Sequence, residues 1–299
     1  SVLGVKEWEC TVIGNRNVAT FIKEFKVALP PGEHMDFEPG SYAQIRIPEF
    51  KDIDYNNFDK SLIGDTYLPA WEKFGLFTLK CSNPDETVRA YSMANYPDEG
   101  DIITLNVRIA TPPFKPKGQG TGFMEVSPGI ASSFIFNLKP GDKVIMSGPY
   151  GEFRPKYGTG REMIWVGGGA GMAPLRAQIM HCLKTLNIRD REMHYFYGAR
   201  ALEEIPFLDD FLQLEKDYDN FHFHLALDRP DPKADEAGVK YTPGFVAPVM
   251  GDTYLKLHEA PEDCEYYLCG PPMMAKTVLD FLHSLGVEDD MIAFDDFGG

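Results

Sequence analysis

The sequence predicts a two-domain fold in which a small antiparallel β-barrel is followed by an α/β domain with a parallel sheet. Three observations support this fold class. The length of 299 residues exceeds what one hydrophobic core usually organises. The first half carries short apolar or alternating runs bounded by Gly, Pro, Asn and Asp, whereas in the second half apolar runs alternate with helical patterns. Hydrophobic (43%) and charged (25%) fractions are typical of a globular chain.

Short strands in the first half predict the barrel, since regular short strands separated by turn residues are typical of that architecture. They are expected over residues 8–13, 21–29, 42–47, 76–80, 88–94 and 102–109. The acidic stretch 48–75 and the Pro/Gly/Lys loop 111–122 have no clear period, so we interpret both as surface excursions. A short helix over 132–138 and a strand over 143–147 are expected to close the domain.

The second half predicts a βαβ series and hence a parallel sheet. Strands are expected over 163–166, 193–197, 221–227, 266–269 and 291–294, with helices over 175–186 and 273–285. A polar Gly/Pro/Lys stretch over 153–161 separates the two halves. We therefore expect a barrel domain over 1–155 and an α/β domain over 156–299.

Charge and cysteine usage exclude several classes of function. The net charge of −16 argues against a nucleic-acid partner, and it requires that any anionic cofactor be held by local dipoles. An odd number of widely spaced cysteines predicts reduced thiols, and the plant-type C-x4-C-x2-C cluster pattern fails after Cys264 and Cys269. His222 and His224 alternate along one predicted strand, where solvation or core packing is the simpler reading, so they are assigned no metal.

A glycine-rich loop over 165–174 follows a predicted strand and opens a helix, which is the context that a phosphate loop requires. Glycines let the backbone approach a pyrophosphate, the helix start supplies unpaired N–H groups, and Pro174 suits the first turn. The alternative is a turn selected for tight strand-to-helix packing. The loop is not the G-x-G-x-x-G of the ordinary dinucleotide fold, which points to a different nucleotide-binding scheme.

Two further motifs lie in the first half. Arg89-Ala90-Tyr91-Ser92 falls on a barrel strand, where the arginine can pair with a diphosphate while the tyrosine and serine contact a flat ring. Residues 128–133, which include Gly129, Ser132 and Ser133, precede the short helix and can bind a second phosphate stretch. The alternatives are plain strand chemistry for the first motif and simple N-capping by serine for the second.

In this order, Arg89-x-Tyr91-Ser92, Gly129-x-x-Ser132, the loop 167–174 and Cys269-Gly270-Pro271-Pro272 resemble the ferredoxin-NADP reductase superfamily, whose fold is an FAD barrel followed by a nicotinamide-nucleotide domain. Within this superfamily, further segments resemble the F subunits of bacterial sodium-translocating NADH:quinone oxidoreductases. The matching segments are 89–96, 167–174, 195–200, 260–267 and 295–299. This resemblance spans nearly the whole chain.

The resemblance implies roles for residues of the first domain. Arg89 would hold the FAD pyrophosphate, Tyr91 would contact the isoalloxazine and ribityl region, and Ser92 would hydrogen-bond near flavin N5. The rest of the FAD site is expected at Gly129, Ser132 and Ser133 for the diphosphate and at Val107 and Arg108 for the adenosine side.

The resemblance also implies a nicotinamide site in the second domain. Cys269 would sit beside the carbon that gives up hydride, and Phe297 would cover the flavin face where the nicotinamide docks. On composition alone, Cys269 is a buried small side chain and Phe297 a docked terminal aromatic. The pyrophosphate and remaining contacts are expected from Gly167, Gly168, Gly169, Ala170, Gly171, Pro174, Arg200, Gly270 and Pro271.

The implied activity is hydride transfer from NADH to FAD, followed by single-electron transfer to a [2Fe–2S] centre. Such chemistry needs no general acid or base, because the cofactors carry it and the protein aligns them. The family's membrane helix and ferredoxin-like [2Fe–2S] domain are absent from this sequence, which begins at Ser1, so we expect a soluble FAD and NADH fragment. Its expected partners are that ferredoxin-like domain and the other proteins of a complex on the cytoplasmic face of the bacterial inner membrane.

The preference for NADH over NADPH rests on charge. A 2′-phosphate needs a basic cluster, yet only Arg200 follows the strand before Glu203 and Glu204, which would repel it. Two alternative functions remain open: an NADH-dependent flavin reductase component of an oxygenase, and a flavin-binding module without turnover. The second would lack a competent nicotinamide site, against which the glycine loop and Cys269 speak.

Overall fold

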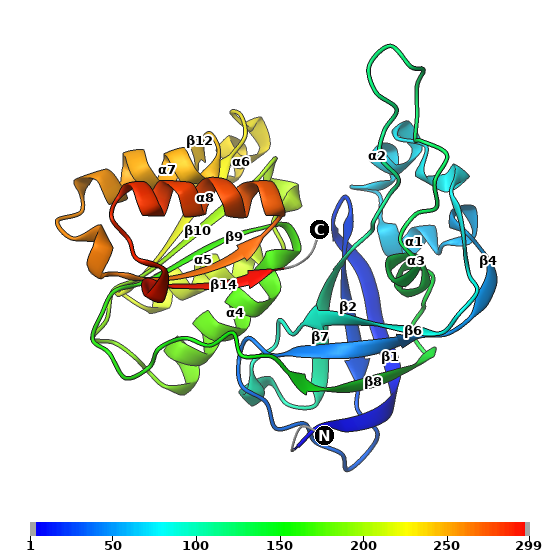
Figure 1. Ribbon diagram of the computed structural model, residues 1–299, viewed down its shortest axis with the longest axis horizontal. Helices are drawn as coiled ribbons and strands as arrows, with labels where there is room; N and C mark the ends of the chain where they lie inside the picture. The colour runs from blue at the N-terminus through cyan, green and yellow to red at the C-terminus, as the bar shows by residue number, and fades with distance from the viewer. Residues whose placement is uncertain (1–3, 297–299) are drawn as a thin grey trace. The chain divides into compact units, whose positions relative to one another are not determined.

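The computed structural model describes residues 4–296, and contacts divide the chain into two units (Figure 1). The first unit ends at Gly151, apart from Glu38–Gly40 and Tyr96–Asp98, which have their contacts in the second. Phe153 already belongs to the core of the second unit. The domain boundary expected between residues 155 and 156 remains a prediction about independent folding.

The first unit is built on a six-stranded antiparallel sheet in the order β6-β3-β8-β1-β2-β7. An isolated bridge between Met93 and Leu105 joins the two edge strands, which closes the sheet into a barrel. The strands are β1 (Lys6–Ala19), β2 (Ile22–Ala28), β3 (Tyr42–Ile47), β6 (Thr87–Ser92), β7 (Ile102–Arg108) and β8 (Lys143–Tyr150). Five of the predicted strands of this half and the closing strand are present.

The stretch 48–75 was wrongly predicted to be a surface excursion. It forms β4 (Phe50–Asp54), α1 (Lys60–Ile63) and α2 (Leu68–Lys73), and it contributes to the barrel core. Trp71 is fully buried, stacks on Phe136 and donates its indole N–H to the carbonyl of Thr20 at 2.6 Å. The stretch has no period because single aromatic residues on short helices supply this part of the core.

The strand predicted over 76–80 is also wrong. A 3-10 turn, Leu76–Thr78, follows Gly75 with its left-handed φ of +73°, and the strand β5 begins only at Lys80 and ends at Asn83. Strand β5 pairs with β4 outside the barrel. The predicted loop at 111–122 holds no helix, and the short helix α3 runs over Ile130–Phe136.

The second unit contains a parallel six-stranded sheet in the order β12-β11-β10-β9-β13-β14, which confirms the predicted fold class. Its strands are β9 (Met163–Gly168), β10 (Met193–Ala199), β11 (Phe221–Leu227), β12 (Thr242–Pro243), β13 (Glu265–Gly270) and β14 (Ile292–Asp296). Only the two-residue β12 has no counterpart among the predicted strands.

Helices cover both faces of this sheet (Figure 1). Alternate residues of β9 point to opposite sides, so Trp165 joins one core while Ile164 and Val166 join the other. The first core contains α4 (Met172–Met180) and α5 (Leu208–Asp217), and the second contains α7 (Val246–Thr253) and α8 (Pro272–Ser284). Helices α5, α6 (Pro232–Ala237) and α7 were not predicted.

None of the helices within residues 4–296 has the length and apolar character that crossing a membrane requires.

Candidate functional site

The carboxyl ends of the parallel strands bring the predicted nucleotide motifs of the second unit together. Gly167 of β9 pairs with Cys269 of β13, and Cys269 pairs in turn with Asp295 of β14. From β9 the chain builds the sheet outward through β10, and it later returns to the other side of β9 as β13. Ligands of open α/β sheets bind at such a switch point, beyond the carboxyl ends of the strands.

Close packing explains three glycines of the loop. A Cβ on Gly171 would collide with the carbonyl oxygen of Cys269, and one on Gly168 would lie 2.7 Å from the sulfur of Met274. A Cβ on Gly167 would lie 2.8 Å from Leu175. The packing alternative therefore applies to these positions: glycine lets the loop lie directly on β13.

The middle of the loop is different, because its backbone is partly exposed. Gly169 and Ala170 are half-buried, and Gly169 has a φ of +54° that favours glycine. The Tyr197 hydroxyl donates to the carbonyl of Gly169 at 2.9 Å and fixes this turn. No side chain caps the start of α4, where Pro174 lies in the first turn. The N–H of Met172 already donates to the carbonyls of Ala170 and Gly169, so an anion could receive hydrogen bonds only from the other main-chain N–H groups of this turn.

Cys269 is fully buried at the end of β13, with its Sγ 4.0 Å from Oδ2 of Asp295. Gly270 is buried beside it, while Pro271 is exposed and caps α8. The structure thus brings Cys269, Gly270 and Pro271 against the glycine loop. Phe297 lies outside the described residues.

The charges beyond β10 differ from the sequence argument in one respect. Arg200 is exposed. Glu203, however, is paired with Lys233 of α6 at 2.9 Å, and this contact raises the pKa of the lysine. Lys233 lies 30 residues away in sequence and was missed. It offsets part of the negative charge on which the preference against a 2′-phosphate was based.

In the first unit, Arg89 and Tyr91 lie on one side of β6, and Ser92 lies on the other. Arg89 is exposed, and no carboxylate within residues 4–296 pairs with it. That is notable in a chain of net charge −16. Tyr91 is half-buried, and burial raises the pKa of its phenol, so it remains a hydrogen-bond donor. Ser92 is 5% exposed.

Ser132 and Ser133 lie in the first turn of α3, and their hydroxyls are engaged within the protein. Ser133 is fully buried, donates to the carbonyl of Gly129 at 2.6 Å and lies 2.7 Å from the Tyr55 hydroxyl. Ser132 Oγ accepts from the N–H of Ala110 at 3.0 Å. The capping alternative is also wrong, because Gly129 is the N-cap and no side chain caps the helix. A phosphate role for this segment would fall to main-chain N–H groups.

The two residues expected on the adenosine side, Val107 and Arg108, differ in exposure. Val107 is fully buried in the barrel core, so a contact of this residue with adenosine would fall to its main chain. Arg108 is exposed, 5.4 Å from the ring of Phe21, which lies 6.1 Å from Phe74. Phe74 and Phe123 line an open groove of about 310 Å³ in this unit. Sequence reasoning missed this groove, although aromatic residues flank the proline-rich loop.

Comparison with known proteins gives two family matches. Residues 74–155 match the oxidoreductase FAD-binding domain, and residues 165–280 match the oxidoreductase NAD-binding domain. The first range includes Arg89 to Ser92 and the start of α3. The second includes the glycine loop and Cys269.

Among curated proteins, the F subunit of the Na(+)-translocating NADH-quinone reductase of Psychrobacter arcticus is 50% identical over 99% of this chain and 68% of its own length. That of Serratia proteamaculans is 51% identical over 100% of this chain and 69% of its own length.

Solved structures share the fold at low identity. The Amycolatopsis cytochrome P450 reductase GcoB has a TM-score of 0.68 at 22% identity, covering 98% of this chain and 70% of its own. A ferredoxin NADP+ reductase from Neisseria gonorrhoeae with bound FAD and NADP has a TM-score of 0.62 at 14% identity, covering 98% of both chains.

Proposed function

The chain belongs to the family of F subunits of Na(+)-translocating NADH-quinone reductases, and from this premise we propose that it binds FAD and NADH and passes hydride from the second to the first. It carries an FAD-binding and an NAD-binding domain and is an FAD-dependent NADH dehydrogenase. When bound, FAD would supply the step from a two-electron donor to one-electron acceptors. The protein binds the two cofactors, orients them and excludes water.

The first unit fits FAD through an unpaired cation beside a half-buried aromatic ring. Arg89 has no carboxylate partner in the described part of the chain, so its guanidinium can form bidentate contacts with a diphosphate. Tyr91 follows on the same side of β6 and can pack on the ribityl and ring portion. Ser92 is proposed to contact N5, and the N–H groups before α3 the diphosphate. Arg108 is proposed for the adenosine side.

The second unit fits NADH through main-chain groups. The uncapped start of α4 and the partly exposed Gly169 and Ala170 can bind the pyrophosphate without any lysine or arginine. Arg200 is proposed to contact the adenosine ribose. Phe297 is proposed to cover the flavin until the nicotinamide ring arrives.

One observation carries the proposal: the pairing of Cys269 with Gly167. A nicotinamide dinucleotide has its reactive ring and its pyrophosphate in one molecule, so both groups must be bound at the same strand ends. A module that only held flavin would have no need for this arrangement. The register brings the two motifs together although 102 residues separate them.

Onward transfer is proposed to a [2Fe–2S] centre on a ferredoxin-like domain of the full-length protein. The chain spans 68% to 69% of the length of these relatives, which leaves room for such a domain. We further propose that the full-length protein contacts the other proteins of a multi-subunit reductase. Its proposed location is the cytoplasmic face of the bacterial inner membrane.

The direct test is anaerobic flavin reduction. The purified chain, reconstituted with FAD, is mixed with NADH or NADPH while the visible flavin band is followed. We expect rapid bleaching by NADH and much slower bleaching by NADPH. Bound flavin that stays oxidised with both nucleotides would refute hydride transfer and favour the flavin-binding module. Equal bleaching by both nucleotides would refute only the preference for NADH. Such a result would fit the Glu203–Lys233 pair, because the lysine offsets part of the negative charge that disfavours a 2′-phosphate.

The proposed role of Arg89 has its own test. We expect Arg89→Ala to weaken FAD binding about 10- to 100-fold, since a charged hydrogen bond contributes about 1.5–3 kcal/mol. The control is Arg46→Ala, which removes an arginine of the neighbouring strand β3 that is already paired with Glu7 at 2.8 Å. Equal FAD dissociation constants for the two variants would contradict the assignment.

A further inference from the structure

Three histidines gather where β10 and β11 begin, at the amino-terminal edge of the second sheet. His194 of β10 pairs in register with His222 of β11, and His224 follows two residues later on the same face. The ring of His194 lies 4.6 Å from that of His222 and 5.2 Å from that of His224. The sequence showed that His222 and His224 alternate on one strand, and no metal was assigned to them. Pairing of β10 with β11 brings His194 beside them.

A carboxylate completes the group. Glu192 Oε2 lies 3.3 Å from His194 Nε2 and 3.1 Å from His222 Nε2, and the three atoms lie within 4.8 Å of one another. Zinc bound tetrahedrally at about 2.0–2.1 Å holds its nitrogen and oxygen ligands about 3.3 Å apart. The two distances to Glu192 therefore match those of a zinc site.

The state of His194 points to a ligand. Its side chain is only 7% exposed, and within residues 4–296 its Nε2 has no hydrogen-bond partner. A buried polar atom without a partner is costly. Its Nδ1 lies 2.9 Å from Nε2 of His224. A proton on that Nδ1 leaves the Nε2 lone pair open, and metal-binding histidines ordinarily donate their second N–H in this manner.

The cluster is open to solvent on one side. Glu192 and His222 are 52% and 37% exposed, so an ion from solvent can reach them and a water can take the remaining position.

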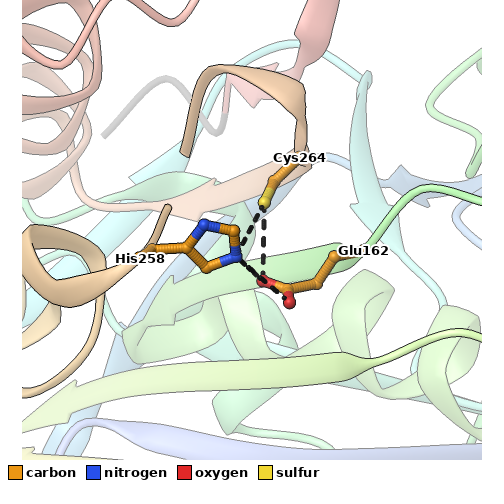
Figure 2. Close-up of side chains that lie close together, drawn as sticks. All are labelled: Glu162, His258 and Cys264. Atoms are coloured by element: carbon orange, nitrogen blue, oxygen red, sulfur yellow. Dashed lines mark hydrogen bonds and ion pairs between the residues drawn. The ribbon is translucent and has the colours of Figure 1, made fainter. Parts of the chain in front are cut away.

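A second cluster in this unit shows what a filled hydrogen-bond network looks like. Figure 2 shows Glu162, His258 and Cys264 with their polar atoms directed toward one another. His258 Nε2 lies 3.2 Å from Glu162, and Cys264 Sγ lies 3.4 Å from the same carboxylate. These distances also suit zinc.

The tautomer of His258 argues against an ion there. Its Nδ1 accepts the N–H of Ala260 at 3.0 Å, so in the neutral ring Nε2 carries the proton and donates to Glu162. The carboxylate also accepts from the Tyr254 hydroxyl at 2.7 Å. Every polar atom of this cluster has a hydrogen-bond partner in the protein. Within residues 4–296, His194 Nε2 instead faces the Glu192 carboxylate at 3.3 Å without forming a hydrogen bond.

We propose that Glu192, His194 and His222 bind one divalent transition-metal ion of the zinc class, with His224 setting the tautomer of His194. The bound ion joins the starts of β10 and β11. Because only the folded chain presents the three ligands together, the ion raises the stability of the second unit, and this gain grows with the logarithm of the free ion concentration.

The first test is titration of the whole chain, freed of metal by a chelator, with zinc chloride in a calorimeter. We expect one equivalent to bind, and His222→Ala and Glu192→Gln to weaken it at least tenfold, which is the scale for loss of a group that tunes a metal site. Both side chains are exposed, so neither variant should unfold the chain. His283→Ala removes an exposed histidine of α8 as the matched control.

Cys264→Ala and zinc X-ray absorption separate the two clusters. We expect zinc binding to survive in Cys264→Ala, and the zinc spectrum of the parent chain to show only nitrogen and oxygen ligands. A sulfur neighbour at about 2.3 Å, or loss of binding in Cys264→Ala, would place the ion among the residues of Figure 2 and overturn the proposal. Binding that His222→Ala and Glu192→Gln leave unchanged would overturn it as well, as would no binding at all.

Discussion

The two edges of the second sheet are built from different parts of the amino acids. The carboxyl edge is mostly backbone: Gly167, Gly168 and Gly171 pack so closely on neighbouring elements that none has room for a Cβ. The amino-terminal edge is mostly ionisable side chains, among them the buried pair Arg191–Glu265 at 3.0 Å. The first edge therefore presents mainly main-chain groups. The second presents ionisable side chains, of which some are buried in pairs and others, such as Glu192 and His222, are open to solvent.

The difference teaches that a sheet of this kind separates binding from stability. Ligands of open α/β folds meet the carboxyl ends, so side chains at the opposite end are free to form networks that fix the strands. Substitutions at the two edges should therefore have different effects, which the following variants can test.

The largest effect is expected from Arg191→Ala at the amino-terminal edge. Arg191 pairs with Glu265 and also donates to the carbonyls of Arg161 at 2.6 Å and Lys156 at 2.8 Å. Its removal leaves the Glu265 charge buried at 2% exposure, so we expect a loss of about 3–5 kcal/mol in urea unfolding. Arg189→Ala, which removes an exposed neighbour, is the control. A loss below about 1 kcal/mol would mean that the edge does not depend on this pair.

A smaller loss of stability, with a larger loss of activity, is expected from Gly171→Ala at the carboxyl edge. The new Cβ meets the Cys269 carbonyl, so the loop must shift at a cost of about 1–3 kcal/mol. NADH-dependent reduction of ferricyanide should fall more than the folded fraction does. Gly158→Ala adds the same atom where nothing lies within 4 Å. Retention of full activity by Gly171→Ala would separate the loop from nucleotide binding.

Acid should weaken the amino-terminal edge first. The folded-state pKa values of His194, about 2, and His224, about 4, lie below the ordinary value of 6.5. Below pH 6.5 the unfolded chain therefore takes up protons that the folded chain does not, and stability is lost as the pH falls. Each histidine contributes at most about 1.4 kcal/mol per pH unit.

The measurement is urea unfolding of the metal-free chain between pH 7 and pH 4.5, and His224→Gln should give a shallower decline. An unchanged slope in that variant would show that His224 is not held neutral by the fold.

The smallest effect is expected from Cys264→Ala in the cluster of Figure 2. The thiol contributes one hydrogen bond to Glu162 at 3.4 Å, so its loss should cost about 1 kcal/mol. Tyr254 and His258 continue to satisfy the carboxylate. A cost comparable to that of Arg191→Ala would mean that the cluster has a role beyond hydrogen bonding.

Much of this fold could be predicted because the period and length of the apolar runs identify the longer strands. Strand β3 at Tyr42–Ile47 and strand β11 at Phe221–Leu227 begin and end where the sequence indicated. The glycine loop was predictable for the same reason: a strand, a glycine run and a helix follow one another without interruption. Its roles in binding remain predictions.

The failures share a physical cause, which is that contacts distant in sequence leave no local pattern. Tyr55 and Trp71 enter the barrel core from short helices, where no window is long enough to show a period. Arg191 meets Glu265 across 74 residues. His194 becomes part of a cluster only when β10 pairs with β11. Each of these needed the topology before it could be seen.

The alternation along β9 sets what kinds of sequence change the second unit can survive. Neighbouring residues such as Ile164 and Trp165 pack in opposite cores. A single inserted or deleted residue would therefore move every later side chain of β9 to the opposite face of the sheet and disrupt both cores at once. Substitution alters one core at one point. Over time, this strand is therefore expected to change its residues while keeping its length.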